Sequence, residues 1–134
     1  MEGDFSVEKI CENLDLKERL SEDFAVRIIN LEKFLREERK ERRISDQIFR
    51  SGTSIAANIA ESKYAESDSD FIHKLAIAQK ETNETLYWLR LLCRTNYIDR
   101  ELYTSLTSDC ITILSILTKI IVKTKSKSKS KSKK

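Results

Sequence analysis

The sequence predicts an all-α protein: an antiparallel up-down four-helix bundle followed by a disordered Lys/Ser tail. Three observations lead to this prediction. The 134 residues contain no proline and only two glycines, so little interrupts a helix. Charged residues make up 35% and apolar residues 40% of the chain, a balance typical of a soluble helical domain. Apolar residues also recur at spacings of three and four, the period of a helix with one buried face.

The first helix is expected over residues 21–38, with Ser21 as its cap. Asp15 and Glu18 have the spacing of a capping box, which leaves an earlier start open. One face of this helix is apolar and consists of Phe24, Ile28, Leu31 and Leu35. A polar connection, "RKERR", follows.

The second helix is expected to begin at Ser45, whose hydroxyl can accept a hydrogen bond from a free backbone N–H, and to end near Tyr64. Its apolar face consists of Ile48, Ile55 and Ile59. Gly52 lies inside it, although an interior glycine costs about 1 kcal/mol relative to alanine. We therefore expect the backbone of a neighbouring helix to approach closely at Gly52.

The third and fourth helices are expected over residues 70–95 and from a cap at Asp99 to about Lys123. Asn96 can end the third helix in the left-handed conformation. The core face of the third helix is Phe71, Leu75, Ala78, Thr82, Leu86, Leu89 and Cys93. That of the fourth is Leu102, Leu106, Cys110, Ile113, Leu117 and Ile120. Short connections make neighbouring helices antiparallel, and four of them close into a bundle.

The chain divides into an N-terminal extension (1–20), the bundle (21–123) and a basic tail (124–134). The last ten residues, "KSKSKSKSKK", contain six lysines and no acid; removing them from the 25 basic residues leaves 19 against 22 acidic ones. The net charge of +3 therefore belongs to the tail, which has nothing to bury and is expected to be disordered.

The protein is expected to be cytoplasmic and not to contact a membrane. Its N-terminus is acidic, unlike a signal peptide, and no uncharged apolar run approaches the roughly 20 residues that span a bilayer. The three cysteines, Cys11, Cys93 and Cys110, are odd in number and form no C-x-x-C pair. A disulfide framework or a zinc site is therefore not expected.

Two further rows of residues suggest contacts beyond the core. Arg50 belongs to a polar stripe on the second helix, which we interpret as a half-buried seam that pairs with adjacent helices or subunits; contact with a nucleic acid or another ligand through Arg50 is the alternative.

On the third helix, a row opposite the core contains the only tryptophan and indicates self-association. The alternative is that Trp88 leans into its own bundle. This row consists of His73, Ile77, Glu84, Trp88 and Leu91, with Tyr87 beside it.

Residues 45–92 contain a specific pattern, which consists of Gln47, Arg50, Ser54-Ile55, Asn58-Ile59-Ala60-Glu61, Asp70-Phe71 and the run from Ala78 to Glu84. This pattern resembles that of the 23S rRNA intervening-sequence protein family. Ser62 departs from it, since many members have glycine there. The similarity extends over residues 21–122. The resemblance implies a four-helix bundle that assembles into a ring, commonly a homopentamer, and for most members the biochemical role is unknown.

The same resemblance implies a distant similarity to the accessory variability protein of diversity-generating retroelements. That protein binds nucleic acid and partners a reverse transcriptase. A reverse transcriptase is therefore an expected partner here.

Catalysis is not expected. The chain has one histidine, which is too few for a di-iron site in a helix bundle, and no glycine-rich loop cradles a phosphate. We therefore predict no catalytic residue, no metal and no cofactor.

Nucleic-acid binding is the sharper hypothesis, through the first connection and the tail. The candidate residues are Arg36, Arg39, Lys40, Arg42, Arg43, Arg50, Lys125, Lys127 and Lys129. Glutamates interrupt the connection, so a solvated helix end is the alternative there, and a solubilising role is the alternative for the tail. We predict a non-enzymatic, oligomeric accessory factor that binds RNA, DNA or a hybrid. An assembly scaffold that recruits a protein partner is the second hypothesis.

Overall fold

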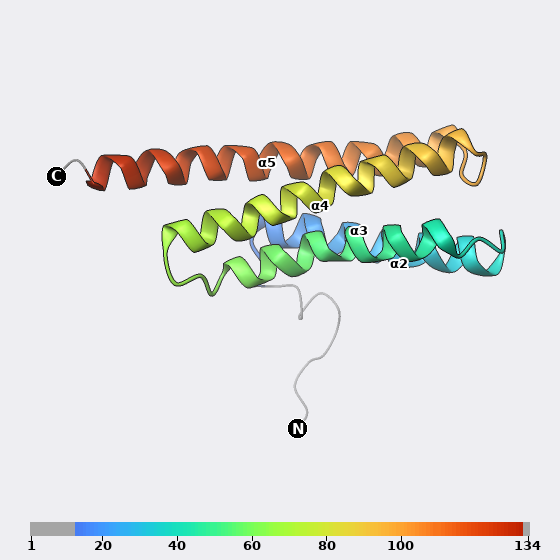
Figure 1. Ribbon diagram of the computed structural model, residues 1–134, viewed down its shortest axis with the longest axis horizontal. Coiled ribbons are helices and arrows are strands. Elements are labelled where there is room, and N and C mark those ends of the chain that lie inside the picture. The colour runs from blue at the N-terminus through green and yellow to red at the C-terminus, as the bar shows by residue number, and fades with distance from the viewer. Residues whose placement is uncertain (1–12, 133–134) are drawn as a thin grey trace, which may run out of the picture.

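The computed structural model describes residues 13–132, which form four helices (Figure 1). These are α2 (Leu16–Glu37), α3 (Arg43–Ser62), α4 (Asp68–Arg94) and α5 (Arg100–Ser132). Each helix packs against the next along the chain, and α5 meets α2 less extensively. Successive helices run back and forth in Figure 1. The predicted all-α four-helix bundle is confirmed.

Side chains of the residues directly before α2, α4 and α5 cap these three helices. The backbone N–H of Glu18 donates to the Asp15 carboxylate at 2.9 Å, and the Glu18 carboxylate accepts from the Asp15 N–H at 3.3 Å. This capping box starts α2 at Leu16, so the predicted start at residue 21 is wrong and the earlier alternative is correct. The side chains of Ser67 and Asp99 cap α4 and α5. Each accepts a hydrogen bond from the backbone N–H three residues later, at 3.0 and 2.8 Å.

The start of α3 differs from the prediction. We expected Ser45 to cap this helix, but α3 begins at Arg43, and Ser45 is buried and donates its hydroxyl to the Glu41 carbonyl at 3.0 Å. The Glu41 carboxylate accepts from the backbone N–H groups of Ile44 and Ser45 at 3.0 and 2.8 Å. Because the Glu41 side chain satisfies two N–H groups that the helix itself cannot satisfy, it does the work predicted for Ser45.

The core lies where the apolar periodicity placed it. Every apolar residue predicted to line the inner faces of the first two helices is buried. On α4, Thr85 and Leu92 join the buried set, while Phe71, Leu86 and Cys93 lie at its edge. The buried Thr85 hydroxyl donates to that of Ser51 on α3 at 2.8 Å, so the polar group buried between these helices has a partner.

Gly52 is buried where α2 and α3 pack together. A Cβ atom built on it would lie 2.7 and 2.8 Å from the Cγ1 and Cγ2 atoms of Ile28 on α2. The close approach that we predicted is present, but the neighbour is a side chain rather than a backbone. Glycine at this position lets Ile28 pack directly on the surface of α3.

Most of the segment predicted to be a disordered tail lies in a helix. We expected residues 124–134 to be disordered, but α5 continues without interruption through Ser132. Extending an existing helix avoids the cost of nucleation, and no proline or glycine ends it. Residues 1–12, including Cys11, and residues 133–134 lie outside the part of the chain that the structure describes.

By length and composition alone, α5 could cross a membrane over Arg100–Ser130, and it is the one helix among the described residues for which this holds. The inner face of α5 packs on the bundle, since Leu106, Cys110 and Leu117 are buried against the other helices. Of the apolar window itself, 28% is buried.

Candidate functional site

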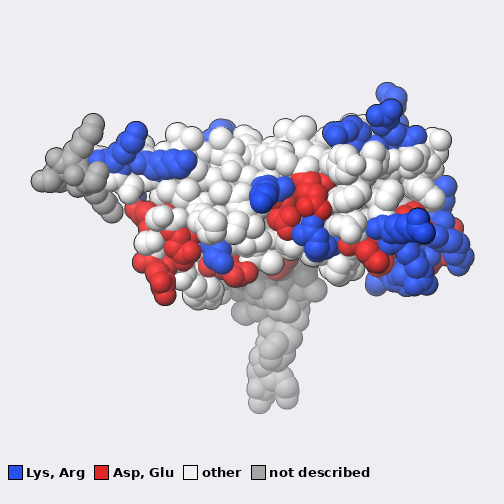
Figure 2. All heavy atoms as spheres, in the orientation of Figure 1, with Lys and Arg blue, Asp and Glu red and all other residues white. Residues whose placement is uncertain are grey.

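Basic side chains gather at both ends of the bundle (Figure 2). One group lies where α2 joins α3 and α4 joins α5, on the right of the view, and the other follows the C-terminal part of α5 at the upper left. Acidic side chains gather near the connection from α3 to α4 at the lower left. The two basic regions predicted from the sequence are therefore far apart in one copy of the protein.

Two arginines have structural partners: Arg36 in the last turn of α2 and Arg39 in the α2–α3 connection. Arg36 pairs with Glu32 one turn earlier, with 2.8 Å between Nε and Oε2. Arg39 donates to the backbone carbonyls of Asn96 and Tyr97, at 3.2 and 3.1 Å, and its guanidinium lies 5.2 Å from the centre of the Tyr97 ring. Arg39 thus fastens the α2–α3 connection to the α4–α5 connection, a contact that local sequence spacing could not reveal.

The other three basic residues of this connection face solvent. Lys40, Arg42 and Arg43 are exposed, and within residues 13–132 none of them forms an ion pair. Lys40 has a positive φ of 55°, so the backbone turns sharply there. Glu41 lies between them, but its carboxylate is turned inward to cap α3. This geometry leaves three adjacent cations at the surface.

Arg50 is held by carboxylates of α4. Its guanidinium donates to Glu81, with 3.0 Å between Nη1 and Oε2, and also to Glu84. The Trp88 indole N–H donates to the same Glu84 oxygen at 2.9 Å. The hydrogen bond to Glu84 is the main reason that the pKa of Arg50 lies above its ordinary value. One arginine between two glutamates gives a locally acidic surface, which does not favour phosphate binding.

This arrangement agrees with the interpretation of the polar stripe as a seam. Arg50 finds its partners on the adjacent helix. Glu61, about three turns later on the same face of α3, pairs with Lys74 of α4 at 3.2 Å. Sequence spacing identified Arg50 but missed Glu81 as its partner. No sequence signal short of the α3–α4 pairing register could have found it.

The predicted interface row on α4 is partly covered by the protein's own side chains. Trp88 is half-buried and packs against the core, while Tyr87 remains 44% exposed, with its ring 4.9 Å from that of Trp88 in an edge-on arrangement. His73 is exposed, whereas Ile77, Glu84 and Leu91 are half-buried. Trp88 does lean into its own bundle, yet the row keeps an exposed aromatic edge at Tyr87.

The C-terminal part of α5, residues 120–132, is called the α5 extension. Its Lys125, Lys127 and Lys129 are exposed and lie on different sides of the helix. Lys125 and Lys129 line a hollow against the first turns of α4, whereas Lys127 faces the α3–α4 connection together with Thr124. Within the described residues, neither Lys125 nor Lys127 forms an ion pair. The extension therefore presents cations in more than one direction.

Within residues 13–132, Cys110 and the acidic residues add no metal-binding cluster to these sites. Cys110 is fully buried, and burial raises the pKa of its thiol to about 12, so it stays protonated at neutral pH. Among residues 13–132, no three His, Cys, Asp or Glu side chains come together in a way that could hold a metal ion.

Comparison with known proteins assigns the family. A sequence model described as 23S rRNA-intervening sequence protein matches residues 12–119. The chain belongs to the 23S rRNA-intervening sequence protein family. A similar fold is found in a crystal structure of a protein with unknown function from the S23 ribosomal protein family, from Bacteroides thetaiotaomicron VPI-5482. The two sequences are 56% identical, and the structures superimpose with a TM-score of 0.79. The match covers 79% of this chain and 98% of that chain. No curated protein matches the chain.

The family match has a clear limit in the structure. It ends at residue 119, whereas α5 continues to Ser132. The 23S rRNA-intervening sequence protein domain therefore comprises α2, α3, α4 and most of α5. The lysine-rich end of α5 lies beyond it, so the function of that extension has to be argued from its own residues.

Proposed function

We propose that this protein is a non-enzymatic, self-associating accessory factor that binds nucleic acid. The observation that supports this proposal most directly is the trio of exposed cations at the start of α3, Lys40, Arg42 and Arg43, none of which forms an ion pair among the described residues. Basic side chains without acidic partners are the groups that neutralise phosphates and release counterions. A reverse transcriptase is the protein partner expected from the resemblance to the accessory variability protein.

Two other sets of residues contribute differently to the proposed binding. The lysines of the α5 extension add a second cationic surface at the opposite end of the bundle. Arg36, Arg39 and Arg50 are held by the protein's own carboxylates, carbonyls and aromatic ring. Since their charges are already engaged, we assign them a structural role and expect weaker direct contact with phosphates.

Self-association would multiply these contacts. In a symmetric oligomer each basic surface is repeated, and several weak phosphate contacts act together. The exposed edge of the α4 row, centred on Tyr87, supports such an assembly, because exposed aromatic residues are enriched at protein interfaces.

Binding is tested with the full chain by fluorescence anisotropy on labelled RNA, DNA and hybrid oligonucleotides over a series of salt concentrations. The triple variant Lys40→Gln/Arg42→Gln/Arg43→Gln is expected to weaken binding by about tenfold or more and to lower the salt slope by about two to three units, since each phosphate contact contributes about 0.7 to 0.9. If none of these three kinds of oligonucleotide binds at about 50 mM salt, the proposal is refuted.

A matched control separates a specific surface from net charge. Lys63→Gln/Lys80→Gln/Lys119→Gln removes the same charge from exposed positions on three other parts of the bundle. If this control weakens binding as much as the first triple variant, the start of α3 is not the binding surface.

Self-association is tested by light scattering on the full chain. Tyr87→Lys places a charge on an exposed side chain, so the bundle should stay folded while the particle mass falls. Trp88→Ala removes the adjacent ring and should act in the same direction. A mass of about 16 kDa for the unmodified protein at all concentrations would contradict self-association. An oligomer that binds no nucleic acid would instead favour the scaffold that recruits a protein partner.

A further inference from the structure

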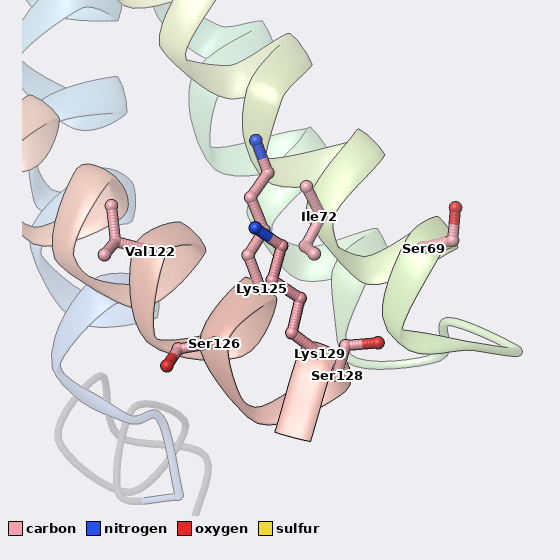
Figure 3. A pocket seen from close by; sticks show the side chains of 7 residues that line it. All are labelled: Ser69, Ile72, Val122, Lys125, Ser126, Ser128 and Lys129. Carbon is pink, nitrogen blue, oxygen red and sulfur yellow. The ribbon is translucent and has the colours of Figure 1, made fainter. Parts of the chain in front are cut away.

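The end of α5 and the start of α4 diverge and leave a groove between them (Figure 3). Its volume is about 690 Å³. We refer to it as the α4/α5 groove. It is lined from α4 by Ser69 and Ile72 and from α5 by Val122, Lys125, Ser126, Ser128 and Lys129.

The lining combines positive charge with an apolar floor. Lys125 and Lys129 are one helical turn apart, which corresponds to about 6 Å along the axis, and both side chains reach toward Ile72 in Figure 3. Val122, which is 61% exposed, and the half-buried Ile72 supply apolar surface. Ammonium groups beside apolar surface suit a ligand that is anionic along one edge and flat and apolar along the other. A nucleotide has both properties.

The apolar floor of the groove limits the form of the ligand. In a duplex the faces of the bases are stacked on one another, whereas in a single strand they can lie on protein side chains. Contact of a base with Ile72 and Val122 therefore requires an unpaired strand. The first turn of α4 carries Asp68 and Asp70, which repel phosphates, so the strand should follow α5 rather than cross the start of α4.

We propose that the α4/α5 groove binds one strand of a single-stranded nucleic acid. Phosphates lie against Lys125 and Lys129, and a base lies on Ile72 and Val122. This inference rests on the proposed function and adds the form of the nucleic acid and its location. The groove depends on the part of α5 beyond residue 119, so it is a property of this chain rather than of the matched domain.

The test compares two double variants of the full chain that lose the same charge from the same helical segment. Lys125→Gln/Lys129→Gln removes the lysines of the groove, whereas Lys123→Gln/Lys127→Gln removes lysines that border a different hollow on α5. The probe is a labelled 12-residue oligothymidylate, with a duplex of equal length beside it. The groove variant should lose about tenfold in affinity for the single strand and about 1.4 units of salt slope, the value for two phosphate contacts. The control should lose less than threefold.

A third variant tests the base contact. Ile72→Ala should weaken oligothymidylate several-fold and leave binding of inorganic polyphosphate, which has no bases, unchanged. Circular dichroism checks that each variant keeps its helix content.

Four results would overturn the inference. An equal loss of affinity for the single strand in the two double variants would mean that the extension contributes only its net charge. Tighter binding of the duplex than of the single strand would place the site elsewhere. Both results would leave the proposed function standing. Preference for an acidic polyglutamate peptide over oligothymidylate would assign the groove to a protein. If no nucleic acid binds at all, the proposed function fails as well.

Discussion

Replacing Gly52 with alanine should destabilise the bundle, although alanine is the better helix former. The added Cβ would lie 2.7 Å from one γ-carbon of Ile28 and 2.8 Å from the other, so α2 and α3 would have to move apart by several tenths of an ångström. Overpacking of this kind costs about 1 to 3 kcal/mol, and the gain in helix propensity returns about 1 kcal/mol. We expect a net loss of up to about 2 kcal/mol in the free energy of unfolding.

A double-mutant cycle distinguishes this explanation from a general effect on α3. Ile28→Ala removes both γ-carbons and should itself cost about 2 to 5 kcal/mol. In that background, Gly52→Ala meets only the Cβ of residue 28, at 3.2 Å, and should stabilise the protein because helix propensity then dominates. Urea denaturation followed by circular dichroism gives the four free energies. Two results would contradict this explanation: Gly52→Ala stabilises the unmodified protein, or it changes the free energy of unfolding in the same direction in both backgrounds. Either result would mean that the close packing of Ile28 on Gly52 is not what requires glycine.

Two further predictions concern single carboxylates. Glu41→Ala removes the acceptor for two backbone N–H groups at the start of α3 and should lower the free energy of unfolding by about 1 to 2 kcal/mol, as for other helix caps; Glu38→Ala, at an exposed neighbouring position, serves as the control. Glu84 has a pKa below its ordinary value, chiefly because Arg50 and then Trp88 donate hydrogen bonds to it. A carboxyl group with a lowered pKa stabilises the fold above its unfolded pKa of about 4.3, and this contribution disappears as the pH falls through the folded pKa. The stability difference between the unmodified protein and Glu84→Gln should therefore be largest near neutral pH and vanish in acid; a difference that persists in acid would contradict the assignment.

Local patterns in the sequence predicted much of the fold. Phe24 and Ile28 recur at helical spacing and are fully buried, because periodic burial is what organises helix packing. Asp99 caps α5, and Asn96 adopts a positive φ of 66°, because both depend only on the few residues around them.

Contacts between residues far apart in the sequence were beyond such reasoning. In the sequence, Arg39 is one member of a basic run, but in the fold it binds carbonyls 57 and 58 residues away. Glu41 interrupts the same run, but its side chain turns inward and caps α3. Arg50 was placed on a polar seam, while its partner Glu81 depends on the register between two helices. The candidate site was therefore predictable as a set of charges, but not as a division between engaged and available ones.

The helical state of the Lys/Ser segment through Ser132 has a geometric consequence for the repeat itself. Each Lys-Ser unit advances the helix by about 200° and about 3 Å, so consecutive lysines alternate between nearly opposite sides. Lys125 and Lys127 illustrate this, since they border different hollows. Adding or deleting one dipeptide at the end of the segment would lengthen or shorten the charged surface without rotating the lysines that precede it. Repeat number could therefore change how far this surface reaches beyond the bundle while the packing of the domain stays the same.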